Sequence, residues 1–245
     1  CYEKALELNP EFNEVHNNLA NAFNSIGEIK KALLHFKKSK DYRSVAQVLE
    51  CLYELDEQSE YQEHLKHLCK INPLNRRVSA ISAYVACQNF SDNPYDFCKN
   101  PLDFIKISNV GKSDLNLNEL EKDVSKLPSI WNLYNTATKS GYHTVGNLFQ
   151  SNFNSIAKLE QIIKNEIELY KNYFSKNNCG FITSWPTKTN LTGWCVSLSK
   201  SGHLESHIHP SGWLSGVFYL KMPKKIKGNE GYLEFSLHGH NYKII

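Results

Sequence analysis

The sequence of 245 residues lacks a long apolar run. No uninterrupted apolar stretch approaches the roughly 20 residues that cross a bilayer as a helix. A basic segment followed by an apolar one, which is typical of a secretory signal peptide, is also missing. We therefore expect no transmembrane helix and a cytoplasmic location.

The sequence also lacks paired cysteines and an excess of charge of one sign. Its seven cysteines form an odd set without a C-x-x-C pair, which argues against a disulfide framework and against a zinc knuckle. The 28 Lys and Arg residues nearly balance the 25 Asp and Glu residues, so the net charge is only +3. No charge field points to nucleic acid as a partner.

The first part of the chain has a helical pattern with a period of 34 residues, because Tyr2 and Ala5 recur as Phe36 and Ser39. Large and small residues alternate as two antiparallel helices require, which predicts one complete repeat at residues 13–46. A weaker unit is expected at residues 41–73. A further helix at about residues 76–87 would cap the array.

This pattern resembles tetratricopeptide repeats and predicts an N-terminal α-α superhelix at residues 1–90. Such an array offers a concave groove for a protein or peptide partner and carries no chemistry of its own. An irregular helical bundle is the alternative interpretation.

The periodicity changes after the helical part. Pro, Asn, Asp and Gly interrupt every period at residues 91–117, which we interpret as a connecting segment with a first strand at residues 103–107. An amphipathic helix at about residues 155–174 is expected to pack on a sheet. After Gly180 the period is two, in the segments GFITSW, TGWCVSLSK, SHIH, LSGVFYLKMP and GYLEFSL. These segments predict an antiparallel barrel or sandwich, such as a jelly roll or a double-stranded β-helix.

His207 and His209 are the candidate metal ligands. Residues i and i+2 of a strand project to the same side, so the two imidazoles would face one space and could chelate one metal ion. Two ordinary histidines at a strand end are the competing interpretation. Tyr219 would share one face of a later strand with Trp213 and Val217, where an inward phenol needs a polar partner.

The segments HIHPSGWLSGVFYL and GYLEFSLHGHNY resemble Fe(II)- and 2-oxoglutarate-dependent oxygenases of the prolyl-hydroxylase-like branch, in particular those fused behind tetratricopeptide repeats. The resemblance implies an α+β multidomain protein with an incomplete double-stranded β-helix at residues 118–245. It also implies a dioxygenase that hydroxylates a second substrate. Fe(II) would be bound by His207, and by His209 in the place of the usual carboxylate, while Tyr219 would bind a carboxylate of 2-oxoglutarate.

In that superfamily a distal histidine ligand and an arginine that binds 2-oxoglutarate lie on later strands. We interpret the sequence as a fragment cut at both ends, and we expect these two residues beyond Ile245. An alternative ligand set consists of Glu205, His207 and His209, because Glu205 alternates onto the His207 face. Successive same-face residues lie about 6.6 Å apart along a strand, which makes three such ligands on one metal difficult.

The other histidines and lysines near the C-terminus receive structural interpretations. We interpret His238 and His240 as rim residues of a turn, since they flank a glycine. A basic loop is expected to be solvated, and it contains Lys221, Lys224, Lys225 and Lys227.

Two other functions compete with the oxygenase. A cupin-type metal enzyme would need a glutamate three or four residues after the H-x-H pair, and residues 211–214 provide none. The second competitor is a non-catalytic interaction scaffold, in which the helical repeats bind a partner and the β domain is degenerate.

Overall fold

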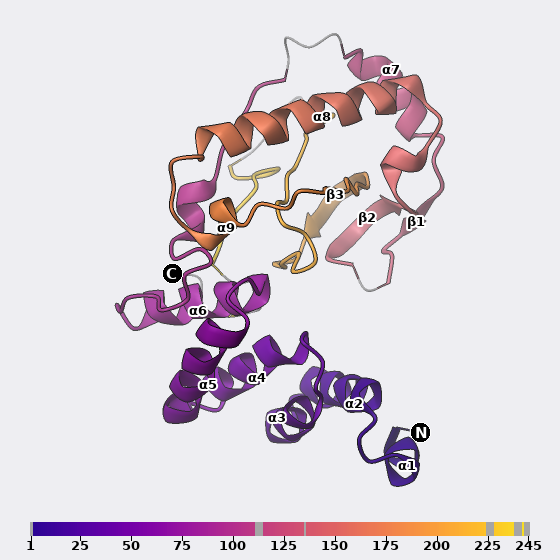
Figure 1. Cartoon of the computed structure of the whole chain (residues 1–245). Helices are drawn as coiled ribbons and strands as arrows, with labels where there is room; N and C mark the ends of the chain where they lie inside the picture. Colours follow the sequence, from indigo (N-terminus) through magenta and orange to yellow (C-terminus); the bar gives the residue numbers. More distant parts are fainter. Residues whose placement is uncertain (1, 111–114, 135, 224–227, 238–241, 243–245) are drawn as a thin grey trace. The chain divides into compact units, whose positions relative to one another are not determined.

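The computed structural model describes residues 2–110, 115–134, 136–223, 228–237 and 242. These residues fold into two compact units, and the fold is mixed α/β and mostly helical (Figure 1). One unit contains the chain up to Pro101 together with Cys179–Phe181. The other contains Leu102–Asn178 and the chain from Ile182 onward. The domain boundaries predicted from the sequence stay predictions.

The described part of the first unit is built from six α-helices, and neighbouring helices pack on each other from α1 to α5, while α6 also packs on α4. Their bounds are α1 (Tyr2–Leu8), α2 (Asn13–Ser25), α3 (Ile29–Lys38), α4 (Ser44–Glu54), α5 (Gln58–Ile71) and α6 (Arg76–Gln88). The helix predicted at about residues 76–87 is thereby confirmed. The tetratricopeptide superhelix itself stays a prediction.

Small residues let the helices of this unit approach one another. Ala20 on α2 and Ala32 on α3 have no exposed surface, and Phe36 on α3 is 1% exposed. These are positions of the large and small pattern read from the sequence, and their burial confirms that the pattern marks the core.

Three of the helices end in the same backbone motif. α2, α4 and α6 are each followed by a residue with positive φ: Gly27 at 79°, Asp56 at 57° and Phe90 at 48°. After α4, the backbone N–H of Glu57 donates to the carbonyl of Leu52 over 2.9 Å, as in a Schellman motif. Glycine adopts this conformation most readily, so Asp56 and Phe90 occupy positions that disfavour a side chain.

A buried ion pair joins α4 to α6. The Arg77 guanidinium donates two parallel hydrogen bonds to the Glu50 carboxylate, Nε to Oε1 and Nη2 to Oε2, each of 2.7 Å. Glu50 is 4% exposed. Because a bidentate pair fixes orientation as well as charge, it links the two helices in a defined geometry.

The segment after α6 is packed, although the sequence predicts that residues 91–117 connect two domains. Tyr95 has no exposed surface; its hydroxyl accepts from the backbone N–H of Asn75 over 2.9 Å and donates to the carbonyl of Asn72. Burial raises the pKa of Tyr95 to about 12. Asn93 orders the same segment, since its side-chain oxygen accepts from the Ser82 hydroxyl over 2.7 Å. Prolines and asparagines mark this segment as irregular, yet irregular backbone can still be buried when such side chains satisfy its polar groups.

The rest of the described chain contains short helices, one long helix and a sheet. In chain order they are η1 (Pro101–Phe104), α7 (Leu117–Val124), β1 (Ser129–Trp131), β2 (Thr138–Thr144), η2 (Leu148–Gln150), α8 (Asn154–Tyr173), α9 (Gly180–Thr183) and β3 (Val196–Leu204). The strands form one antiparallel sheet in the order β1-β2-β3. A bilayer-crossing helix is not found among the described elements, since each is too short or too polar for that role.

Several of the predicted strands are wrong. Residues 103–107 begin in the 3-10 helix η1, and the segment GFITSW begins with α9. Of the later segments, TGWCVSLSK overlaps β3, whereas SHIH, LSGVFYLKMP and GYLEFSL carry no strand in their described residues. A strand requires a neighbour that supplies ladder hydrogen bonds, and alternation of side chains alone does not provide one. The double-stranded β-helix therefore stays a prediction.

The long helix predicted at residues 155–174 is confirmed by α8, which lies beside α7 (Figure 1). Its main partners are α7 and η2 rather than a sheet. The core between them contains Leu120, Leu148, Ile156 and Leu159, with Phe218 and Leu220 packed against it. The sequence shows that one face of α8 is apolar, but an apolar face does not specify whether a helix or a sheet covers it.

Candidate metal centre

A bulge in β3, opposite Ser140 of β2, shapes the strand that leads to the two histidines. The pairing between β2 and β3 shifts register between Lys139 and Gly141, and Ser140 has a φ of 50°. A Cβ added at Gly202 on β3 would lie 2.5 Å from the Ser140 carbonyl oxygen, so this close approach requires glycine. Bulges bend a strand and redirect the side chains that follow it, and here the following residues are the candidate ligands.

The loop after β3 is held at both ends. At its start, the backbone N–H of Glu205 donates to the Ala137 carbonyl over 2.9 Å, and the Glu205 carboxylate lies 3.2 Å from the Lys139 ammonium. At its end, the backbone N–H of Gly212 donates to the His209 carbonyl over 3.0 Å. The segment that carries His209 is thus fixed by the sheet on one side and by a turn on the other.

Within this loop, the rings of His207 and His209 converge. Their Nε2 atoms are 3.1 Å apart, and the rings meet edge to face with centroids 4.7 Å apart at 87°. Both residues are exposed to solvent. The structure therefore brings together the pair that the H-x-H spacing predicts, although it does so in a loop rather than in a strand.

Neighbouring groups orient the two rings. The Nδ1 atom of His207 lies 2.7 Å from the Glu205 carbonyl oxygen, which can only accept, so Nδ1–H is the donor and Nε2 is the ring nitrogen directed at His209. Partial desolvation of the His209 ring, followed by the proximity of His207, lowers the pKa of His209. Both effects favour the neutral imidazole that binds metals.

The donor set fits a divalent metal ion. An imidazole nitrogen lies about 2.1 Å from a bound metal, so two such ligands at roughly right angles are about 3.0 Å apart, close to the 3.1 Å found here. A backbone carbonyl that fixes the tautomer of a ligating histidine is also typical of metal sites. The same separation suits an N–H···N hydrogen bond from His209 to His207, so metal binding requires His209 to carry its proton on Nδ1 instead.

The pair provides two ligands, and a complete site needs more. Across the described ranges, no group of three or more His, Cys, Asp or Glu side chains is placed to hold a metal. This corrects the alternative set that includes Glu205, whose carboxylate instead pairs with Lys139. His238 and His240 lie outside the described residues.

Two aromatic residues that the sequence did not predict, Trp194 and His143, lie beside the histidine pair. The Trp194 ring lies 5.5 Å from the His209 ring, centroid to centroid, and 5.7 Å from the His143 ring, on which it stacks at 18°. His143 is placed by the sheet, because it pairs with Val196 at the start of β3. His143 lies far from His209 in the sequence, so no sequence pattern predicts that the two residues are near each other. The pairing of β2 with β3 places the rings of His143, Trp194 and His209 next to one another.

Tyr219 faces away from the helices. Phe218 and Leu220 pack against the core beneath α8, whereas Val217 and Tyr219 are 60% and 48% exposed. The side chains thus alternate although no strand is assigned, but the face with Tyr219, which the sequence predicts to point inward, is the exposed one. The role of Tyr219 at a cosubstrate stays a prediction.

The basic loop is described only in part. Lys221 lies 2.5 Å from the Glu121 carboxylate of α7, so it is engaged in an ion pair. The remaining lysines of the predicted loop, Lys224, Lys225 and Lys227, fall outside the described residues.

Residues 192–242 match the model of a protein family described as "Putative 2OG-Fe(II) oxygenase". The match contains the converging histidines, Trp194 and Tyr219, and it covers less than half of the chain. No curated protein matches the sequence. The family description supports an oxidoreductase that uses Fe(II) and 2-oxoglutarate, and iron is among the metals that imidazole ligands bind.

Proposed function

We propose that the segment around His207 and His209 forms part of the active site of an Fe(II)- and 2-oxoglutarate-dependent dioxygenase, and that the helical unit binds a protein partner or substrate. The observation that carries this proposal is the 3.1 Å approach of the two Nε2 atoms within the segment that matches the oxygenase family. When bound, Fe(II) and 2-oxoglutarate supply oxidative decarboxylation coupled to hydroxylation of a second substrate.

Each residue of the segment has a distinct task in this proposal. His207 binds the metal through Nε2, and the Glu205 carbonyl holds the proton on the opposite ring nitrogen. His209 provides the second nitrogen; because it stands where related sites carry a carboxylate, it leaves the site with one more positive charge. Trp194 limits the rotation of the His209 ring and shields one side of it from water. Tyr219 offers a hydroxyl that can donate to a carboxylate of the cosubstrate.

An anaerobic titration with Fe(II) and 2-oxoglutarate tests the proposal. The visible charge-transfer band of the chelated cosubstrate is expected in the natural protein and should be lost in His207→Ala. His203→Ala is the matched control, since His203 lies on β3 close in sequence to the pair and is not assigned to it. A folded protein that shows no band under saturating Fe(II) and 2-oxoglutarate would favour the non-catalytic scaffold.

A further inference from the structure

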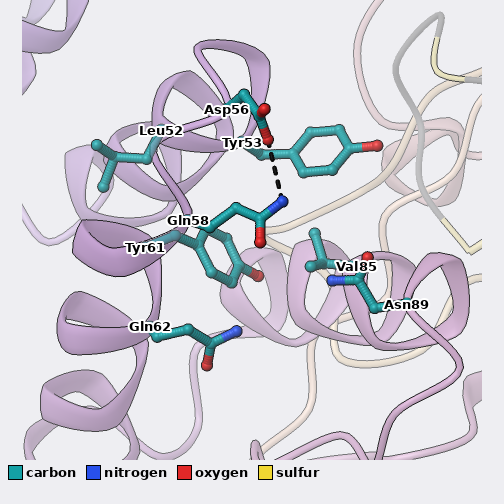
Figure 2. Close-up of a pocket in the computed structure, with 8 residues that line it drawn as sticks. All are labelled: Leu52, Tyr53, Asp56, Gln58, Tyr61, Gln62, Val85 and Asn89. Carbon is teal, nitrogen blue, oxygen red and sulfur yellow. Dashed lines mark hydrogen bonds between the residues drawn. The ribbon is translucent and has the colours of Figure 1, made fainter.

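The helical unit contains a small cleft at the turn between α4 and α5, closed by the C-terminal end of α6 (Figure 2). Its volume is about 40 Å³. The lining residues are Leu52, Tyr53, Asp56, Gln58, Tyr61, Gln62, Val85 and Asn89. The cleft belongs wholly to the first unit and is independent of the candidate metal centre.

A buried hydroxyl without a partner lies at this cleft. Tyr61 is 3% exposed, and within the described part of the chain its hydroxyl oxygen makes no hydrogen bond. In Figure 2 the Tyr61 ring points across the cleft toward α6, with Gln58 beside it. A buried polar group that remains unpaired is costly, and native proteins rarely retain one. The hydroxyl is therefore suited to bind a group that enters from outside.

The charge of the lining favours a cation. Asp56 is the one acidic residue among the lining side chains, and none of them is basic. The C-terminal end of α4 lies at the same turn, and the carbonyl groups of a helix C-terminus carry partial negative charge. Burial raises the pKa of Tyr61, so its hydroxyl is neutral near pH 7 and its oxygen can accept a hydrogen bond.

The Asp56 carboxylate is carried by a backbone position with positive φ, where glycine is preferred. Asp56 occupies the left-handed position of the helix-ending motif, which after α2 is filled by Gly27. One oxygen of its carboxylate accepts a hydrogen bond of 3.0 Å from the Gln58 amide. This hydrogen bond orients the carboxylate before a ligand arrives.

The size of the cleft, and the hydrogen bond that already occupies one carboxylate oxygen of Asp56, favour an ammonium over a guanidinium. A single water needs about 10–15 Å³ of such space, so the cleft admits the end of a side chain rather than a cofactor. A planar guanidinium binds best to both oxygens of a carboxylate, whereas an ammonium is compact and can donate in three directions. We propose that this cleft binds the ammonium group of a lysine side chain presented by a protein partner.

The test is an NMR titration of the ¹⁵N-labelled protein with Nα-acetyl-lysine amide. We expect saturable shifts of the side-chain or backbone amides of Gln58, Gln62 and Asn89. Tyr61→Phe, which removes only the hydroxyl, should weaken the affinity about five-fold. Asp56→Asn should weaken it by a similar factor of about five, and asparagine tolerates the positive φ of this position.

Two controls separate this site from a general effect of charge. Glu63→Gln on α5 makes the same change in net charge at an exposed residue outside the lining and should leave the affinity unchanged. Nα-acetyl-norleucine amide, which has an apolar stem and no ammonium, should not bind. The proposal is overturned if the lysine probe gives no saturable shift at the lining residues, as for a site that holds only water. Equal affinity in Asp56→Asn and Glu63→Gln, or preference for the arginine analogue, would also overturn it.

Discussion

Each of the two units contains a pair of histidines in contact, and the pairs differ in what their surroundings leave available. In the helical unit, the Nδ1 atoms of His16 on α2 and His35 on α3 are 2.8 Å apart. The Nε2 atom of His16 lies 2.8 Å from the Pro10 carbonyl, and His16 is 3% exposed. Both nitrogens of His16 are thus used inside the protein, and the pair acts as a hydrogen-bonded link between two helices.

The pair of the second unit is open. His207 and His209 are exposed, and their Nε2 atoms face one point that solvent can reach. The Nδ1 atom of His207 is engaged with the backbone carbonyl of Glu205. The comparison shows that closeness of two imidazoles alone does not identify a metal site, because both ring nitrogens of His16 are already used inside the protein. It can be tested by changing one pair while observing the other.

The largest effect is expected when the pair of His16 and His35, here called the closed pair, is disrupted. His16→Ala removes a buried ring and leaves the Pro10 carbonyl without its donor, so the helical unit should lose about 2–4 kcal/mol of stability. His207→Ala changes an exposed loop residue and should alter stability by less than about 0.5 kcal/mol. Amide hydrogen exchange of α2 and α3 for His16→Ala, and of β2 and β3 for His207→Ala, measures each effect in its own unit. If both variants lost stability equally, the distinction between a structural and an open pair would be wrong.

A smaller effect is expected when the support of the open pair is removed. Trp194→Ala frees the His209 ring to rotate, so the affinity for Fe(II), measured by anaerobic titration, should fall about ten-fold. Trp194→Phe keeps an aromatic ring against His209 and should restore most of the affinity. Trp131→Ala is the matched control, because Trp131 packs on Tyr142 in the same sheet. Unchanged affinity in Trp194→Ala would show that this ring does not position the ligand.

The sequence predicted local features of the fold better than its long-range pairing. The bounds of α6 and α8 lie within one or two residues of the predicted helices, because a 3.6-residue period and the breaks beside it are local signals. The strands were less predictable. β2 in particular contains Ser140 and Gly141 and was not predicted at all, since its stability comes from β1 and β3 on either side.

The candidate site likewise contains residues that a local sequence pattern predicts and residues that only long-range pairing brings in. His207 and His209 were predicted because two residues of spacing suffice to place their side chains together. His143 could not be found from the sequence, because it reaches Trp194 only through the register that pairs it with Val196. Tyr61 was equally hidden, since a missing hydrogen-bond partner is a property of the folded surroundings and not of the residue type.

The smallest effect is expected from pH, and it concerns His35 of the closed pair. Burial, and then the proximity of His16, lowers the pKa of His35 below its usual 6.5. The unfolded chain therefore binds the proton more readily, and the stabilising contribution is complete above about pH 6.5 and declines as pH falls toward the lowered value. Because His35 is only half-buried, solvent screening limits this loss to about a few tenths of a kcal/mol. His35→Gln cannot titrate, so its urea midpoint followed on α2 and α3 should vary less between about pH 5 and pH 7.5 than that of the natural protein. A steeper pH dependence in the variant would mean that another group, and not the closed pair, controls acid sensitivity in the helical unit.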